Sequence, residues 1–135
     1  MGFGDLKRFE LLSDGTVYAR AGVQTNSGGI AGIHVRIEPN LQGNQHFSVT
    51  VAEWKDKDNF GAVPGSAVPG DLRIAVFAGA RSALEDMRAP IALSFELIDA
   101  LVHPVDGNPR RFKEAGSRAM TGWLELQGFE VETPS

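Results

Sequence analysis

The chain of 135 residues contains no cysteine. This absence excludes disulfide bonds, a thiolate nucleophile and cysteine-ligated zinc together. It also lacks any apolar run near the roughly 20 residues that a membrane-spanning helix needs. The N-terminal residues contain no basic segment followed by an apolar core, so we expect no signal peptide. These absences predict a cytoplasmic protein without a membrane partner.

An excess of positive charge is missing as well. Thirteen Lys and Arg stand against 17 Asp and Glu, which gives a net charge of -4 and a pI of about 5.3. Proteins that bind nucleic acid usually carry a basic excess, so this balance disfavours strong non-specific RNA binding but leaves room for a local basic patch. The hydrophobic content of 42% and charged content of 22% are ordinary for one globular domain, expected over residues 1–135.

Motifs for nucleotide hydrolysis, nucleophilic catalysis and metal binding do not occur. No lysine follows a glycine as a P-loop requires, and no serine stands in a G-x-S-x-G elbow. The three histidines, His34, His46 and His103, are far apart, and single histidines are more often exposed or structural than catalytic. The sequence therefore predicts a non-enzymatic protein with no cofactor, no nucleotide and no metal, with a small-molecule enzyme as the remaining alternative.

The hydrophobic pattern predicts strands in the first half of the chain and helices later. Strands are expected at residues 6–12, 16–23, 33–38, 47–54 and 91–98, with a last short strand at 129–132. The first two strands flank a Ser-Asp-Gly turn and predict a hairpin. The fifth is almost continuously apolar and is expected in the centre of the sheet. Glycine-rich residues 25–32 and irregular residues 55–70 are expected to be loops.

Two helices are expected from apolar residues at spacings of three and four. The first begins at Asp71 and stops before Pro90. The second has Asn108 as its N-cap and Pro109 as its first residue, and Gly128 could end it. The order β-β-β-β-α-β-α predicts an α+β two-layer sandwich, in which both helices cover one face of an antiparallel or mixed sheet.

The first turn of the second helix holds three cations, Arg110, Arg111 and Lys113. Helix N-termini carry partial positive charge, so each cation there is disfavoured by about a few tenths of a kcal/mol. The functional interpretation is a basic patch for phosphate or for an acidic partner. The alternative is that solvent screens these charges and that they serve only solubility.

Several short motifs also follow one another in a defined order. They are SGG at 27–29 with Gly32, VRIEP at 35–39, GAVP at 61–64 with Pro69, HPVD at 103–106, and FKEAGSRA at 112–119. In this order and spacing they resemble domain IV of translation elongation factor G and of related ribosome-protection-type GTPases, over about residues 23–123.

This resemblance implies the ribosomal protein S5 domain 2-like fold, which has a four-stranded sheet, two helices on one face and a left-handed β-α-β connection. Residues 1–23 would then add an N-terminal hairpin, residues 24–127 would form the domain IV-like part, and residues 128–135 a C-terminal strand or tail. In the family, two tip loops contact the tRNA–mRNA duplex on the ribosome. Carried over, the tip would hold Ser27, Gly28, Gly29, His103 and Asp106.

The tip departs from the family pattern because Ile30 stands where the family has an arginine, and no GTPase accompanies it. The expected function is therefore non-enzymatic binding of RNA or the ribosome through the tip and the basic first turn, in a translation-related role. The alternative is a protein–protein interaction module on the same scaffold without RNA binding. The oligomeric state, the partner and any modification of His103 stay open.

Overall fold

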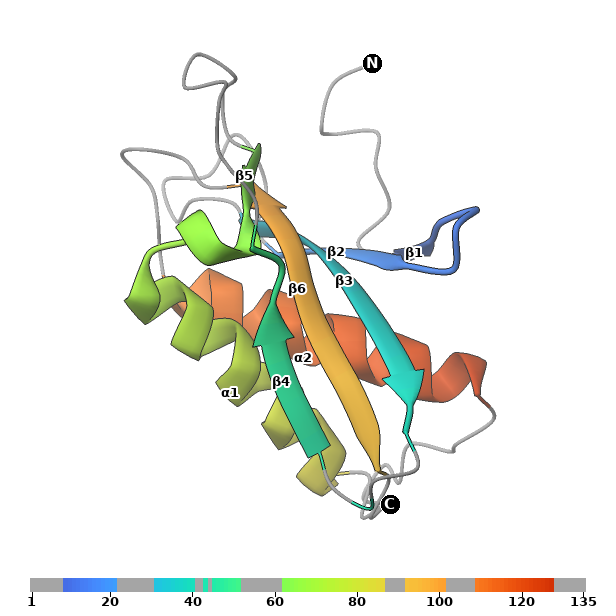
Figure 1. Cartoon of the computed structure of the whole chain (residues 1–135). Helices are drawn as coiled ribbons and strands as arrows, with labels where there is room; N and C mark the ends of the chain where they lie inside the picture. Colours follow the sequence, from blue (N-terminus) through green and yellow to red (C-terminus); the bar gives the residue numbers. More distant parts are fainter. Residues whose placement is uncertain are drawn as a thin grey trace.

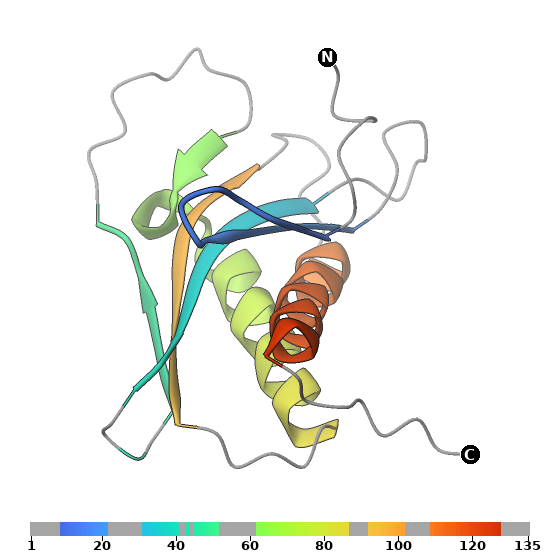
Figure 2. The same cartoon turned by 90° about the vertical axis from the view of Figure 1, so that its right-hand side faces the viewer.

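The computed structural model describes residues 9–21, 31–40, 43, 45–51, 62–86, 92–101 and 109–127. Its elements are β1 (Phe9–Leu11), β2 (Val17–Ala21), β3 (Ala31–Pro39), β4 (Gln45–Val49), β5 (Ala62–Pro64), the 3-10 helix η2 (Gly65–Ala67), α1 (Gly70–Asp86), β6 (Leu93–Leu101) and α2 (Pro109–Leu126). Figures 1 and 2 show a sheet as one layer and both helices as the other. The α+β two-layer architecture and the mixed sheet are therefore confirmed.

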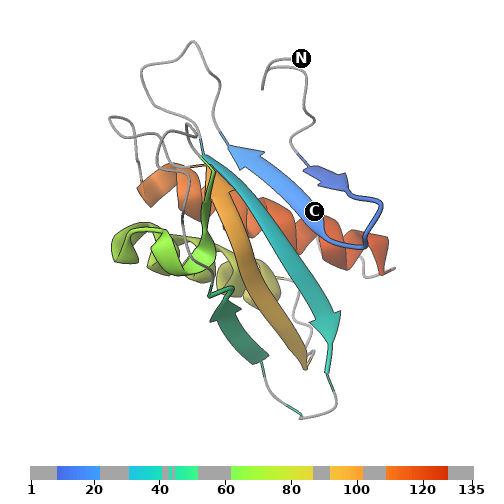
Figure 3. The ribbon, with the colours of Figure 1, turned by 45° about the horizontal axis from the view of Figure 1, so that its top comes forward.

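Within the described residues the sheet has six strands in the order β1-β2-β3-β6-β4, and β5 pairs separately with β6 (Figure 3). The β4–β6 pair is parallel and the others are antiparallel. The sheet thus differs from the expected four strands plus a hairpin. The hairpin β1–β2 is present, but β2 pairs with β3 along its whole length, so the hairpin belongs to the sheet. As expected, β6 is central, between β3 and β4.

The connection from β4 to β6 has an unusual hand. In Figure 1 both strands run upward, β6 lies to the right of β4, and α1 lies behind the sheet. Figure 2 shows from the side that both helices cover this one face. A connection that passes behind parallel strands and moves to the right is left-handed, whereas nearly all β-α-β connections are right-handed.

The core lies between the sheet and the two helices. The apolar stripe predicted for α2 is buried throughout and consists of Phe112, Ala115, Gly116, Ala119, Met120 and Trp123. The stripe predicted for α1 is buried apart from the half-buried Ala75, and its last member lies outside the described residues. That stripe consists of Leu72, Ala75, Val76, Gly79, Ala80, Ala83, Leu84 and Met87. Gly79 of α1 and Gly116 of α2 bring the helix backbones into direct contact: a Cβ at Gly79 would meet the carbonyl of Lys113, and one at Gly116 would meet that of Val76. Small residues in both stripes therefore set the distance between the helices.

Three aromatic rings join α1 to the parallel strands. Phe47 of β4 lies 5.5 Å from Phe77 of α1 and 5.6 Å from Phe95 of β6, measured between ring centroids. The guanidinium of Arg81 lies over the Phe47 ring, 4.5 Å from its centroid. Tilted aromatic pairs and a cation over a ring both stabilise such a contact. They fix β4, an edge strand, against the helix layer.

Several element boundaries differ from the sequence prediction. The strand expected at 47–54 is β4, which ends at Val49. The alternation of the sequence places Val51 on the same side as Phe47 and Val49, but Val51 is 85% exposed. Ala31 and Gly32, expected in a loop, begin β3. At Gly32 a Cβ would meet the phenol oxygen of Tyr18, so a larger residue there would displace the Tyr18 side chain.

Other differences concern the stretch expected to be an irregular loop and the helix ends. Residues 62–67 form β5 and η2, because β5 pairs with the end of β6. Helix α1 begins one residue early, at Gly70, and α2 begins at Pro109 as predicted. The N-cap Asn108, the stop at Pro90, the end at Gly128 and the strand at 129–132 lie outside the described residues.

Candidate functional site

The five predicted tip residues, Ser27, Gly28, Gly29, His103 and Asp106, lie outside the described residues. The residues on either side of them are described. Ala21 at the end of β2 pairs with Ala31 at the start of β3, and the next residue, Gly32, pairs with Leu101 at the end of β6. Residues 22–30 therefore connect two strands at one end of the sheet. The chain also leaves β6 at this same end, where residues 102–108 begin.

The basic first turn of α2 follows directly from that end. The side chain of Arg110 is 87% exposed and that of Arg111 is 25% exposed. Both lie close to Glu114: Arg110 Nε is 4.0 Å and Arg111 Nη1 is 3.3 Å from its carboxylate oxygens. The sequence prediction included the cations and missed this acid, although the spacings of three and four along a helix place such side chains side by side. Glu114 offsets part of the patch's positive charge.

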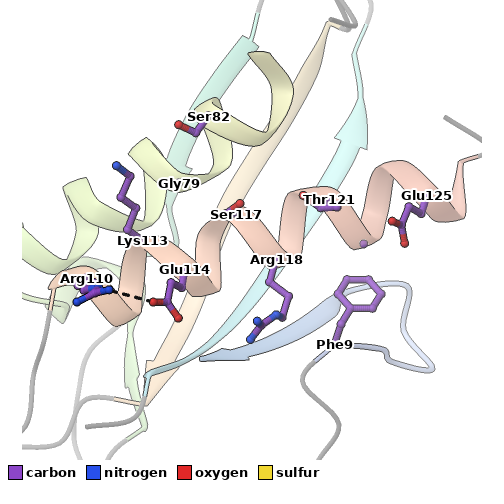
Figure 4. Close-up of a pocket in the computed structure, with 11 residues that line it drawn as sticks. Phe9, Gly79, Ser82, Arg110, Lys113, Glu114, Ser117, Arg118, Thr121 and Glu125 are labelled. Atoms are coloured by element: carbon purple, nitrogen blue, oxygen red, sulfur yellow. Dashed lines mark ion pairs between the residues drawn. The ribbon is translucent and has the colours of Figure 1, made fainter. Parts of the chain in front are cut away.

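Lys113 is the third cation of the patch and differs from the two arginines. It is exposed, and Figure 4 shows its side chain directed toward α1, on the side of Ser82. Within the part of the chain that the structure describes, Lys113 has no ion-pair partner. Its ammonium group is therefore the cation of this turn most available to an anion from outside.

An open groove of about 890 Å³ runs along the outer face of α2 (Figure 4). Arg110 and Lys113 stand at one end, Phe9 of β1 forms a wall further along, and Gly79 and Ser82 come from α1. Arg118 also lines it, and its guanidinium donates a hydrogen bond to the backbone carbonyl of Arg20 on β2. The rest of the lining is small, polar or acidic: Glu114, Ser117, Thr121, Gly122 and Glu125.

A second polar cluster, which the sequence prediction missed, lies on the helix-free face of the sheet. Thr16 Oγ1 is 2.6 Å from His34 Nε2, and His34 Nδ1 is 3.0 Å from Asp99 Oδ2. The order of groups, hydroxyl to imidazole to carboxylate, is that of a hydrolase triad. Thr16 directly precedes β2, His34 lies on β3 and Asp99 on β6, so only the sheet register brings them together. The His34–Asp99 pair lies next to a β-bulge in β3–β6 pairing.

The hydroxyl of this cluster is not placed as a nucleophile. Thr16 has no exposed surface, and its Oγ1 lies 2.5 Å from Asp14 Oδ1, which also accepts a hydrogen bond from the Thr16 backbone N–H at 3.0 Å. These hydrogen bonds, that of the hydroxyl first, hold the pKa of Asp14 below its usual value. A nucleophile must be reachable by its substrate, so the cluster's geometry is that of a structural link.

Tyr18 stands opposite His34 on β2. Burial raises the pKa of its phenol to about 12, so the phenol is neutral at physiological pH. It therefore contributes no negative charge to the cluster around His34.

Other site classes have no support in the described ranges. No group of three or more potential metal ligands occurs there. No helix that the structure describes is long and apolar enough to cross a membrane. No protein-family model matches the chain, and no curated protein matches it either.

Proposed function

We propose that this protein binds structured RNA or the ribosome through one end of its sheet together with the first turn of α2, in a translation-related role in the cytoplasm. The observation that carries this proposal is the convergence of strand ends. The first predicted tip segment lies between Ala21 and Ala31, and the second follows Leu101. All three residues lie at one end of the sheet. Arg110 begins the helix that follows the second of these segments.

The scaffold supports the same interpretation. After the β1–β2 hairpin, the chain forms the strands β3, β4 and β5, the helix α1, the central strand β6 and the helix α2, with a left-handed connection into β6. The resemblance to domain IV of elongation factor G implies four strands, two helices on one face and a connection of this hand. Because left-handed connections are rare, their occurrence supports the ribosomal protein S5 domain 2-like assignment more strongly than the layer architecture does. Fold alone carries no activity, so the proposal also needs the charged first turn of α2 beside that end of the sheet.

A protein-interaction module without RNA binding is the second candidate. Glu114 lies beside both arginines of the patch, and the chain carries a net charge of -4. Both observations weaken the attraction for a polyphosphate chain. The two candidates differ in how they respond to salt and to loss of Glu114, which makes them separable by measurement.

The test is binding of purified protein to fluorescently labelled structured RNA, followed by anisotropy, and co-sedimentation with ribosomes over a salt series. We expect affinity to fall steeply with salt, because phosphate contacts release counterions. Lys113→Ala and Arg110→Ala should each weaken binding and lower the salt slope by about one per lost phosphate contact. Arg36→Ala is the matched control, because Arg36 is an exposed arginine in the middle of β3.

Glu114→Gln gives a test in the opposite direction. This substitution removes one negative charge from the patch, so the affinity for RNA should rise. The affinity should still fall as the salt concentration increases. Binding that is absent at low salt, or that responds equally to Arg36→Ala and Lys113→Ala, would reject the RNA proposal and leave the protein-interaction module.

A further inference from the structure

The charges at the two ends of α2 are placed against the dipole of the helix. Its first turn holds cations and no acid, and its last turn holds Glu125 and no base. A helix N-terminus favours acids and a helix C-terminus favours bases. Helix α1 follows this rule at its start, where Asp71 lies in the first turn. Helix α2 alone would therefore be more stable with its end charges exchanged.

One row of side chains on α2 runs from the basic end to the acidic end. Four residues that line the groove stand four positions apart and so form one ridge along the helix, the groove row: Lys113, Ser117, Thr121 and Glu125 (Figure 4). The two charged members are exposed. Within the described ranges neither of them has an ion-pair partner. The groove row thus presents a cation, two short hydroxyl side chains and an acid to the outside.

The groove row is complementary to itself when a second copy of α2 lies antiparallel to the first. Lys113 then lies beside Glu125 of the second copy, and Ser117 lies beside its Thr121. A two-fold axis repeats each of these pairs, so two ion pairs form with short side chains between them. Ridges of residues four apart interdigitate in the commonest class of helix packing in globular proteins. The short side chains in the middle allow the two helices to approach closely.

The antiparallel arrangement also reverses the unfavourable placement of the end charges. The cations of the first turn face the C-terminal end of the second helix, which carries partial negative charge and Glu125. Glu125 in turn faces the positive N-terminal end and Lys113 of the second copy. A helix from another protein would need an acid, short residues and a cation in the same order. The chain's own α2 already carries this order.

We infer that a second copy of this chain docks antiparallel on the outer face of α2, and that the groove row forms the centre of a two-fold symmetric dimer. The inference does not rest on RNA binding, and its tests contain no RNA. Lys113 would take part in both interactions, so RNA bound at the first turn of α2 and the second copy would compete for this face.

The first test is sedimentation velocity of the purified protein over a concentration series at low salt. We expect a dimer that forms with rising concentration and weakens with salt, because salt screens exposed charges. Lys113→Glu and Glu125→Lys each place like charges at both ends of the pair, so each should weaken the dimer about tenfold. Glu38→Lys makes the same charge change at an exposed residue of β3 and should leave the dimer unchanged.

Mixing the two charge-reversed variants gives the decisive result. In a mixed dimer of Lys113→Glu with Glu125→Lys, opposite charges meet again at both ends. The equimolar mixture should therefore associate about as tightly as the wild-type protein. The first variant carries a net charge of -6 and the second -2, relative to the wild-type -4, so their overall charges repel each other.

A wild-type protein that stays monomeric at every concentration in low salt overturns the inference. So does a dimer that survives both single reversals, or a mixture that associates no better than its components. Circular dichroism and thermal unfolding check that each variant is folded.

A second measurement locates the contact. The chain has no cysteine, so a single introduced cysteine reports one position. A mixture of Ser117→Cys and Thr121→Cys should form an intermolecular disulfide with oxidised glutathione faster than a mixture of Ser117→Cys and Glu38→Cys. Equal rates in the two mixtures would show that the outer faces of α2 do not meet.

Discussion

The two polar clusters of this protein are built in opposite ways. The cluster at the start of α2 joins residues three and four positions apart on an exposed helix, Arg110, Arg111 and Glu114. The cluster on the sheet joins Thr16, His34 and Asp99, which the chain separates by 18 and 65 positions. Exposed pairs at helical spacing contribute about 0.3–0.5 kcal/mol. The hydrogen bonds of the buried Thr16 hydroxyl contribute more, at about 0.5–1.5 kcal/mol for a typical intramolecular hydrogen bond. Local charge is therefore free to serve binding, while the long-range cluster serves the fold.

The largest expected effect comes from disturbing the close contact between α1 and α2. Gly79→Ala places a Cβ against the carbonyl of Lys113, so α1 and α2 must move apart. Overpacking of this kind costs about 1–3 kcal/mol and sometimes more. We expect a loss at the upper end of this range in urea unfolding, together with altered chemical shifts along the groove.

The control for this change is Gly70→Ala at the first residue of α1, where an added Cβ has no close neighbour. Its stability should stay within about 0.5 kcal/mol of the wild-type protein. Equal effects of the two substitutions would contradict the close helix contact.

The next effect separates the sheet cluster from the helix cluster. Thr16→Val keeps the buried shape and removes the hydroxyl that Asp14 and His34 share. Because the partners that remain, Asp14 and His34, reach solvent, we expect a loss of about 0.5–1.5 kcal/mol, the net value of a typical hydrogen bond, and urea unfolding should register it. Thr121→Val on the surface of α2 is the matched control, since it changes the same group in the groove, and it should cost less. A larger loss of stability in Thr121→Val than in Thr16→Val would contradict this difference between the two clusters.

A smaller effect concerns acid. Because hydrogen bonds lower the pKa of Asp14 below its ordinary 3.8, its contribution to stability is present above that value. It is lost as the pH falls through the lower, folded-state pKa. Stability measured by urea unfolding from pH 5 downward should therefore fall more in the wild-type protein than in Asp14→Asn. Parallel curves would mean that the Asp14 carboxylate gains nothing on folding.

The smallest effect tests the helix cluster. Glu114→Gln removes the acid beside Arg110 and Arg111, and thermal unfolding should show a change of about 0.5 kcal/mol or less, because the pairs are exposed. The same variant is expected to bind RNA more tightly. A large loss of stability would show that this cluster is part of the fold and not a surface reserved for a partner.

Local patterns in the sequence were sufficient for the helices and for the centre of the sheet. The stripes from Leu72 to Leu84 and from Phe112 to Trp123 repeat every three to four residues, and their burial follows. The apolar run that became β6 was placed centrally for the same reason. Pro109 fixed the start of α2 because a proline lacks the N–H that this position does not need.

Register and pairing could not be read from local pattern. Nothing near His34 in the sequence indicates Asp99, and their contact depends on the β3–β6 pairing beside a bulge. β5 is three residues long and follows no alternation of its own, so it exists only because β6 extends past β4. Whether the tip residues Ser27 and His103 form a site is still a prediction, since they lie outside the described residues.

The central position of β6 also determines when the fold can form. β6 pairs with β3, β4 and β5, yet it follows all of them in the chain. Until Leu93–Leu101 has been synthesised, β3 and β4 have no strand between them and their pairing edges are open. Unpaired strand edges invite aggregation in nascent chains, and contacts between distant residues slow folding. On a translating ribosome, the first ninety residues must therefore wait for the strand that joins them.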